Sequence, residues 1–473
     1  MPSRPAPLAL HPDRLLPVDP AVRSIARRLY GTVRDLPIIS PHGHVDPRIL
    51  LDDVPFTDPA QLFVTPDHYV TRLLHACGVP LDALGVGQGS LSEAGAREAW
   101  RLLCSHWSAY SGTPVRYWLE SELADIFGVS VRPSAATADA IYDQIAGQLT
   151  EPAFRPRALF DRFNISVLAT TDDPCDDLSV HASLAADPTW AGRVLPTFRP
   201  DRYLEAFEPG WIGAVNRLAE VAGIETGTYP GWVRAMENRR QYFIAHGARS
   251  ADHSHVDAGT APLEPAEADL LYRSALAGTV TRAEAAALRR HMLLEMARMS
   301  TVDGLTMTLH MGVRRGHHEP TRARFGPDTG HDLPLRVDFT DSLRPLLERY
   351  GTHPNLTLVL FTLDETAFSR EIAPLAGFYP SVYVGAPWWF FDAPDAVRRW
   401  RSAITETVGF SRTSGFIDDT RAFCSIPARH DMSRRLDSGY LAQLVAEHRI
   451  DEDEAAQTAV DLVTVRPQEV FKL

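Results

Sequence analysis

The chain carries eight short runs of apolar and β-branched residues, and each run ends abruptly at a charged, imidazole or aromatic side chain. In chain order the runs are LPIIS, ISVLATT, RVLPTF, YFIAHG, LTMTLH, LTLVLFTL, SVYVGA and SGFI. Short continuous apolar runs of this kind are typical of buried parallel strands. The pattern therefore predicts eight strands, the first at residues 36–40 and the last at residues 414–417.

Longer stretches with apolar residues at helical spacing lie between most of these runs. Examples are residues 214–223, 283–299, 341–350 and 393–408, which are long enough for crossover helices. A strand, a polar residue and a helix, repeated eight times, form a (β/α)8 TIM barrel, in which reactive side chains lie at the carboxyl ends of the strands. We therefore predict an α/β fold of this type, with an open doubly wound sheet as the alternative.

About 120 residues separate the first predicted strand from the second, far more than one crossover helix needs. Amphipathic helical patterns fill this gap at residues 68–78, 96–110, 117–128 and 136–149. We predict a helical insertion subdomain over residues 46–160, within a single catalytic unit that spans residues 1–473.

The composition excludes several kinds of chemistry. The chain has 47 basic and 60 acidic residues, a net charge of −13, and its only lysine is Lys472. A Walker A phosphate loop, a Schiff-base enzyme and a carbamate-bridged binuclear metal site all need an interior lysine. The acidic balance also argues against nucleic acid or an anionic membrane as the partner, and favours a small molecule.

The sequence predicts a cytoplasmic protein. No apolar run approaches the roughly 18 residues that a membrane-spanning helix needs, and proline and aspartate interrupt the N-terminal segment where a signal peptide would be apolar. The four cysteines are widely spaced without a CxxC pair, as expected of reduced thiols. We also expect a homo-oligomer.

Two histidines follow the first predicted strand in the motif SPHGH. His42 and His44 are separated by one residue, so on extended backbone both imidazoles point to the same side and can reach one ion. Asp419, after the last predicted strand, is the candidate third ligand, because closure of a barrel brings the first and last strands together. Asp418 competes for this role, and the other aspartate would then be a helix cap or a structural ion-pair partner.

His310, at the end of the fifth predicted strand, is either a fourth ligand or a core histidine. With no interior lysine, we expect one divalent metal ion rather than two. The ligand types favour zinc, with manganese and iron as alternatives.

Arginines follow several predicted strands, at Arg199, Arg249, Arg314, Arg315 and Arg421. Converging guanidinium groups suit an anionic substrate, because arginine binds a carboxylate through two parallel hydrogen bonds. The alternative for any one of them is a structural ion pair.

Nine motifs together resemble one family. They are HGH, DHY, TTDDP, PTFRPD, GARSADH, LHMGVRR, GPDTGHD, PWWFFD and DDTR, and they occur in the family's order along almost the whole chain. The chain resembles the uronate isomerases, the glucuronate isomerase branch of the metal-dependent amidohydrolase superfamily. The resemblance implies a (β/α)8 barrel with a helical insertion after strand 1. It also implies isomerisation of D-glucuronate or D-galacturonate to fructuronate or tagaturonate.

The resemblance also implies roles for individual residues. The metal ligands are expected at His42, His44 and Asp419, and the catalytic residues at Tyr69, Asp419, Arg421 and His68. The substrate-binding residues are expected at Arg199, Asp252, His310, Arg314 and Trp388. In the expected mechanism Tyr69 transfers a proton, activated by its cationic surroundings, and Asp419 with a metal-bound water is the competing base. His42 or His68 could assist opening of the sugar ring, while Arg199 and Arg421 hold the substrate carboxylate.

Three segments depart from the family pattern. Val70 and Thr71 replace the usual Lys-Trp pair after DHY, Gly316, His317 and His318 replace an asparagine-rich stretch, and DDTR replaces TDSR. These changes flank the expected ligands, so they affect substrate preference more than reaction type. The alternatives are a metal-dependent hydrolase of an anionic amide, ester or lactone, and a sugar-acid binder without turnover.

Overall fold

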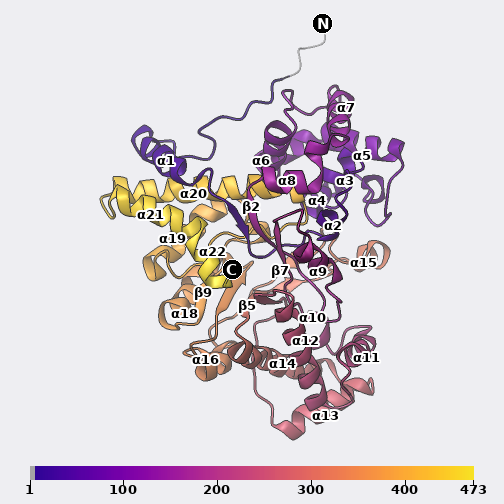
Figure 1. The fold of residues 1–473 in the computed structure, drawn as a ribbon. Helices are drawn as coiled ribbons and strands as arrows, with labels where there is room; N and C mark the ends of the chain where they lie inside the picture. Colours follow the sequence, from indigo (N-terminus) through magenta and orange to yellow (C-terminus); the bar gives the residue numbers. More distant parts are fainter. Residues whose placement is uncertain (1–5) are drawn as a thin grey trace.

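The computed structural model describes residues 6–473 and has an α/β fold built on parallel strands (Figure 1). Two sheets have the strand orders β1-β2-β3 and β4-β5-β8-β9, and every pairing within them is parallel. The strands are β1 (Ile38–Ser40), β2 (Ile165–Ala169), β3 (Arg193–Leu195), β4 (Ser250–His253), β5 (Thr306–Met311), β8 (Leu358–Thr362) and β9 (Val382–Val384). A small antiparallel hairpin, β6 (Val313–Arg314) with β7 (Leu333–Pro334), follows β5.

Single backbone bridges continue the strand order beyond the two sheets. Phe198 pairs with Asp172 and with Ala251, which joins the extension of β3 to β4. Val384 of β9 pairs with Thr413 in the same way. In residues 6–473 the strands follow the predicted order, but no continuous ladder closes them into a ring. The parallel α/β fold is thus confirmed, whereas the closed TIM barrel remains a prediction.

Two of the eight strand predictions are wrong. Residues 242–245 form the end of helix α12 (Tyr229–Ala245), residues 246–247 form the turn after it, and the strand begins at Ser250. A short apolar run does not distinguish a buried helix end from a buried strand. Residues 414–417 form no strand, because Gly415 has a φ of +72°, in the left-handed region that interrupts extended backbone.

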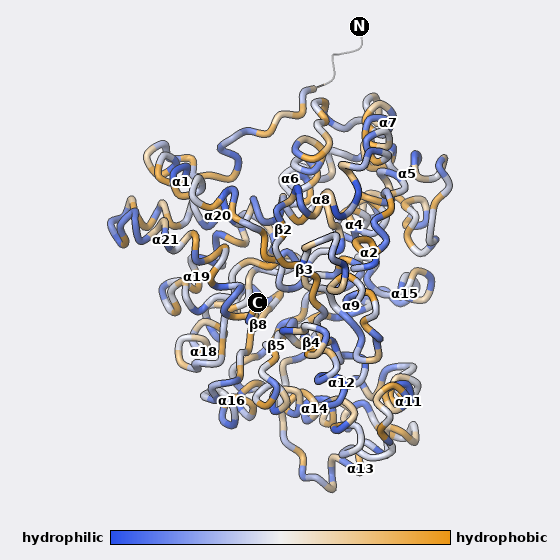
Figure 2. Tube along the Cα trace, viewed as in Figure 1, coloured by the Kyte–Doolittle hydropathy of each residue, from blue (hydrophilic) through white to orange (hydrophobic). Residues whose placement is uncertain are grey.

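Helices cover the outside of the strands, and their ends carry ordinary capping signals. Helix α14 starts with a capping box between Thr281 and Glu284 and ends at Gly304, whose φ is +78°. In Figure 2 hydrophobic segments lie along β2 and β8, while α11 and α21 alternate between hydrophobic and hydrophilic residues. The helices after β2 are α9 (Ser179–Ala186), α10 (Asp201–Leu204), α11 (Trp211–Ala222), α12, α13 (Pro265–Leu276), α14 (Arg282–Asp303), α15 (Glu319–Phe325), α16 (Arg344–Tyr350), α17 (Glu365–Ala367), α18 (Ala373–Phe378), α19 (Pro394–Val408), α20 (Ile426–Ala446), α21 (Glu452–Val463) and α22 (Val465–Phe471).

Helices also fill the gap between β1 and β2, and Figure 1 shows them gathered beyond one side of the strands. They bury Trp100, Phe63 and Phe127 in edge and tilted ring contacts. These helices are α2 (Arg48–Asp52), α3 (Pro59–Phe63), α4 (His68–Ala76), α5 (Glu93–Ser105), α6 (Pro114–Ser121), α7 (Ala138–Leu149) and α8 (Pro156–Arg162). Helix α1 (Pro20–Val33) packs on α20 and α21. None of the helices within residues 6–473 combines the length and the apolar character that a bilayer crossing requires.

Candidate active site

A cavity of about 820 Å³ is lined by residues that follow the carboxyl ends of the parallel strands. Its wall includes residues just after β1, β3, β4 and β5, the first turn of α4, and residues 388–389 and 419–421. A volume of this size is typical of small-molecule sites. The fold therefore brings most of the predicted site residues to one concave place.

Four predicted residues converge at one end of this cavity. His44 Nε2 lies 2.9 Å and His42 Nε2 lies 3.4 Å from Asp419 Oδ1. The imidazole rings of His42 and His310 stack with centroids 4.8 Å apart. Three atoms that could bind a metal, a ring nitrogen each from His42 and His310 and a carboxylate oxygen of Asp419, lie within 4.8 Å of one another. His310, which the sequence left open, thus lies in the same cluster as the predicted ligands.

The hydrogen bonds of this cluster leave a ring nitrogen and a carboxylate oxygen available as metal ligands. Asp252 Oδ1 accepts hydrogen bonds from His310 Nδ1 at 2.6 Å and from the Thr308 hydroxyl at 2.7 Å. Because His310 Nδ1 donates, Nε2 keeps its lone pair. His310 Nε2 is buried and makes no hydrogen bond within the described residues, and the buried Asp419 Oδ1 is faced by the Nε2 atoms of His42 and His44. Buried polar atoms without partners are costly, so this donor set fits a divalent metal ion.

The carboxylates of Asp419 and Asp252 are held ionised. Burial alone would raise the pKa of Asp419, but His42 and His44 outweigh it and hold the pKa well below its usual range. Burial also opposes ionisation of Asp252, yet His310, His42 and Arg199 together lower its pKa well below the ordinary value. Both side chains therefore present negative charge in the cavity.

The backbone at Asp419 distinguishes it from Asp418. Asp419 has a φ of +43°, in the left-handed region that aspartate tolerates better than most residues. Asp418 instead faces His430, with Oδ2 3.1 Å from the Nε2 atom, and is buried there. Of the two aspartates, Asp419 is the one that lines the cavity.

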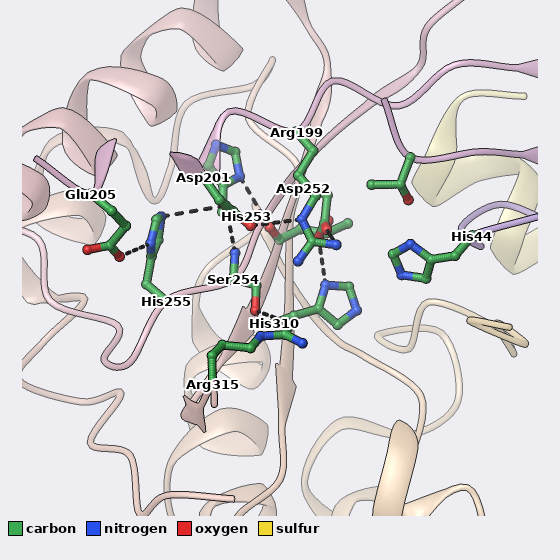
Figure 3. A network of polar contacts seen from close by, with 12 residues as sticks. His44, Arg199, Asp201, Glu205, Asp252, His253, Ser254, His255, His310 and Arg315 are labelled. Carbon is green, nitrogen blue, oxygen red and sulfur yellow. Dashed lines mark hydrogen bonds and ion pairs between the residues drawn. The ribbon is translucent and has the colours of Figure 1, made fainter. Parts of the chain in front are cut away.

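Arg199 lies next to the histidine cluster (Figure 3). Its Nε donates to Asp201 Oδ2 at 2.8 Å, and Nη1 lies 3.4 Å from Asp252 Oδ2. Burial opposes the guanidinium charge, but Asp201 and Asp252 outweigh it, so the pKa of Arg199 is raised. A half-buried guanidinium that contacts two carboxylates through Nε and Nη1 still has Nη2 to offer to an anion.

His68 and Tyr69 come from the first turn of α4. Asp67 caps this helix by accepting a hydrogen bond from the Tyr69 backbone N–H at 2.8 Å. The two aromatic rings stack 4.8 Å apart. Burial lowers the pKa of His68 to about 3, with help from Arg421. Burial also raises the pKa of the Tyr69 phenol, which the cation of Arg429 offsets only in part.

Arginines and tryptophans also line the cavity. Arg421 Nη2 donates to Asp328 Oδ2 at 2.7 Å, and Arg315 Nη1 donates to the other oxygen of the same carboxylate at 3.0 Å. Trp388 contacts the His310 ring edge-on at 4.8 Å. Arg314 lines the cavity with an exposed side chain.

Known proteins match this chain over its full length. The model of the glucuronate isomerase family matches residues 21–471. The chain belongs to the glucuronate isomerase family. The uronate isomerase of Cutibacterium acnes is 54% identical over 98% of this chain and 99% of its own length, and that of Corynebacterium efficiens is 53% identical over the same shares.

Solved structures of the family have the same fold. The glucuronate isomerase of Caulobacter crescentus has a TM-score of 0.96 at 47% identity and covers 98% of this chain and 97% of its own. The uronate isomerase of Thermotoga maritima has a TM-score of 0.92 at 28% identity, with 98% and 99% covered. This chain is therefore an isomerase by family, as its motifs predicted.

The predicted site residues line one cavity, with the exceptions of Arg249 and of Asp418, the competing ligand candidate. Arg249 lies just before β4 rather than after it, because the fourth strand was predicted too early. The sequence did not single out Asp201, Asp328 or Trp389, which also line the cavity. Asp328 lies in the predicted motif GPDTGHD, but no strand precedes it, so its position carried no strand-end signal.

Proposed function

We propose that this enzyme interconverts D-glucuronate or D-galacturonate with the corresponding ketouronate, fructuronate or tagaturonate. One observation supports this activity above others. The donor cluster of His42, His310 and Asp419 lies in the same cavity as the guanidinium of Arg199, with Asp252 between them. Such a cavity can take the aldehyde end of a sugar acid at the donor cluster and its carboxylate at the arginine.

Moving the carbonyl group from C1 to C2 requires loss of the C2 proton, a cis-enediolate and protonation at C1. The chemistry supplied by one divalent ion held by His42, His44 and Asp419 is stabilisation of the negative charge that develops on the sugar oxygens. We propose zinc, because imidazole nitrogen and carboxylate oxygen are ligands that it commonly takes. His310 is the candidate fourth ligand or a substrate contact.

Proton transfer is assigned to Tyr69. The expected activation by nearby cations is contradicted, because burial raises the pKa of Tyr69; the hydroxyl stays protonated at neutral pH, which suits a group that donates a proton in the transition state. Asp419 is the competing base. His68 is neutral because burial lowers its pKa to about 3, so it is assigned to ring opening through hydrogen bonds to the sugar rather than as a strong base.

Substrate binding is assigned to the cations and aromatic rings of the cavity wall. Arg199 and Arg421 hold the carboxylate, since each guanidinium has at least one nitrogen without a carboxylate contact among residues 6–473. Asp252 with His310 orients the sugar hydroxyls, and Trp388 and Arg314 form the wall and the mouth.

The sequence-based predictions of fold, domain organisation, location and assembly are part of this proposal. We infer a (β/α)8 barrel with an open seam, in which residues 46–160 form a helical insertion subdomain of a single unit. We also propose a cytoplasmic homo-oligomer, with no nucleic-acid or membrane partner. The four cysteines are free thiols, in keeping with a reducing compartment.

The test is a coupled assay of the purified, metal-analysed protein with glucuronate, galacturonate and a panel of lactones and amides. We expect uronate turnover and one bound metal per chain. Asp419→Asn tests the metal centre without disturbing the backbone, because asparagine also tolerates a φ of +43°. Full activity in this variant would contradict the assignment, and turnover of a lactone or amide alone would favour hydrolysis.

In heavy water, solvent deuterium is expected in the ketose, because the C2 proton exchanges when an enediolate forms. Complete retention of the substrate hydrogen would instead indicate a hydride shift. The experiment therefore separates the two routes to the same product.

A further inference from the structure

A buried histidine lies behind Arg199, between two carboxylates. His255 follows β4, and its side chain is fully buried. Its Nδ1 atom lies 2.7 Å from Glu205 Oε1, and its Nε2 atom lies 3.7 Å from Asp201 Oδ1 (Figure 3). The ring therefore contacts both acidic groups from one position.

The short helix α10 sets the spacing of the two acids. Asp201 is its first residue and Glu205 follows its last, so the carboxylates are four residues apart and lie on the same face. The imidazole of His255 lies between these two carboxylates and comes from the segment just after β4. The backbone fixes its position, because the carbonyl of His255 accepts a hydrogen bond from the Gly312 N–H at 2.9 Å.

Asp201 connects this histidine to the active-site arginine. One carboxylate oxygen of Asp201 accepts from Arg199 Nε at 2.8 Å, and the other accepts from the Ser254 N–H at 2.9 Å. At the far end of the chain of contacts, Glu205 Oε1 lies 3.7 Å from Arg289 Nε. Basic and acidic side chains therefore alternate from the cavity to α14, in the order Arg199, Asp201, His255, Glu205 and Arg289.

The Nε2 atom of His255 is buried and has no hydrogen bond among the described residues, and the Asp201 carboxylate lies 3.7 Å from it. We propose that His255 is a positioning residue, which together with Glu205 holds Asp201 and thereby fixes the guanidinium of Arg199 for the substrate carboxylate. This inference rests on the proposed function, in which Arg199 binds that carboxylate.

The effect of the positioning is expected in binding rather than in proton transfer. In His255→Ala the spacer between Asp201 and Glu205 is lost, and Arg199 is no longer held in one orientation. We expect the KM for glucuronate to rise about tenfold, the equivalent of one hydrogen bond to a charged group. We expect kcat to change by less than about twofold and the bound metal to remain.

Two further variants keep the test informative if His255→Ala does not fold. His255→Gln retains an amide that can donate to Glu205, so it is expected to restore part of the lost affinity. Glu205→Gln changes a side chain that is 31% exposed, so the fold tolerates it, and a smaller rise in KM is expected. His291→Asn is the matched control, because it removes a buried imidazole from α14 that does not line the cavity.

A double-mutant cycle tests whether His255 acts through Arg199. If it does, His255→Ala adds little to the loss in apparent affinity already caused by Arg199→Ala. Additive losses in the double mutant would overturn the inference. So would an unchanged KM in His255→Ala, His255→Gln and Glu205→Gln, or a fall in kcat with loss of metal in His255→Ala. The wild-type protein separates this result from the proposed function, because failure of the wild type to isomerise uronates would contradict the function itself.

Discussion

Asp431 joins three parts of the chain, so its replacement tests what holds the helices around the active site. Its carboxylate accepts hydrogen bonds from Arg14 Nη2 at 2.9 Å, the Tyr117 hydroxyl at 2.6 Å and Arg435 Nε at 2.9 Å. The Tyr30 hydroxyl is a fourth donor. These donors come from the N-terminal segment, from α6 of the predicted insertion and from α20.

Asp431→Asn removes the charge and directs an amide towards groups that are themselves donors. A hydrogen bond to a charged group contributes about 1.5–3 kcal/mol. Asparagine keeps one acceptor oxygen, and the side chain is 20% exposed, which reduces the loss. We therefore expect the free energy of unfolding to fall by about 2–4 kcal/mol. Asp395→Asn is the control, since that carboxylate is 81% exposed in its pair with Arg398 and is expected to change stability by less than about 0.5 kcal/mol.

The pH dependence provides the refuting result. Burial raises the pKa of Asp431, but Arg14, Arg435 and the tyrosine hydroxyls outweigh it, so the pKa lies below the ordinary value of about 3.9. The stabilisation is complete above that ordinary value and is lost as the pH falls through the lowered folded-state pKa. Unfolding midpoints followed by circular dichroism should therefore differ most at neutral pH and converge in acid. Equal midpoints at neutral pH, or a difference that persists in acid, would refute the reasoning.

Three further predictions concern the site. Tyr69→Phe should lower kcat by about 10²–10⁴-fold with little change in KM, and a wild-type kcat in the coupled assay would remove Tyr69 from proton transfer. Dialysis against a chelator should abolish turnover, and added divalent metal should restore it; activity that survives with no metal detected would contradict a metal enzyme. Gly385→Ala would place a Cβ atom in steric clash with the ring of Phe361, which stacks on His310 at 4.1 Å. It should cost about 1–3 kcal/mol of stability and lower kcat, and an unchanged melting temperature and rate would show that the ring can move freely.

The sequence predicted those parts of the fold whose signal is local. Six of the eight strands and the four crossover helices were found, because a buried strand between helices reads as a short apolar run. The two errors have local causes as well. The end of α12 is as apolar as a strand, and the left-handed Gly415 interrupts extended backbone where the pattern SGFI is apolar.

The candidate site shows the same division. His42, His44 and His310 could be found from the residues alone, because each lies within four residues of the carboxyl end of a strand. Tyr69 lies on a helix of the predicted insertion, so only the resemblance to the family singled it out. His255 also follows a strand, but its importance depends on Glu205, which lies 50 residues away in the chain. No spacing rule relates two such positions.

The near absence of lysine gains a physical meaning at Arg199. Its Nε and Nη1 atoms contact Asp201 and Asp252, and the planar guanidinium still has a nitrogen to offer to a substrate carboxylate. A lysine ammonium is a single strongly hydrated centre, so protein carboxylates that fixed its position would also occupy the place where the substrate binds. Arg421 has the same arrangement, with Asp328 on one of its nitrogens. A cavity that both fixes its cations with carboxylates and binds an anionic sugar therefore requires arginine at these positions.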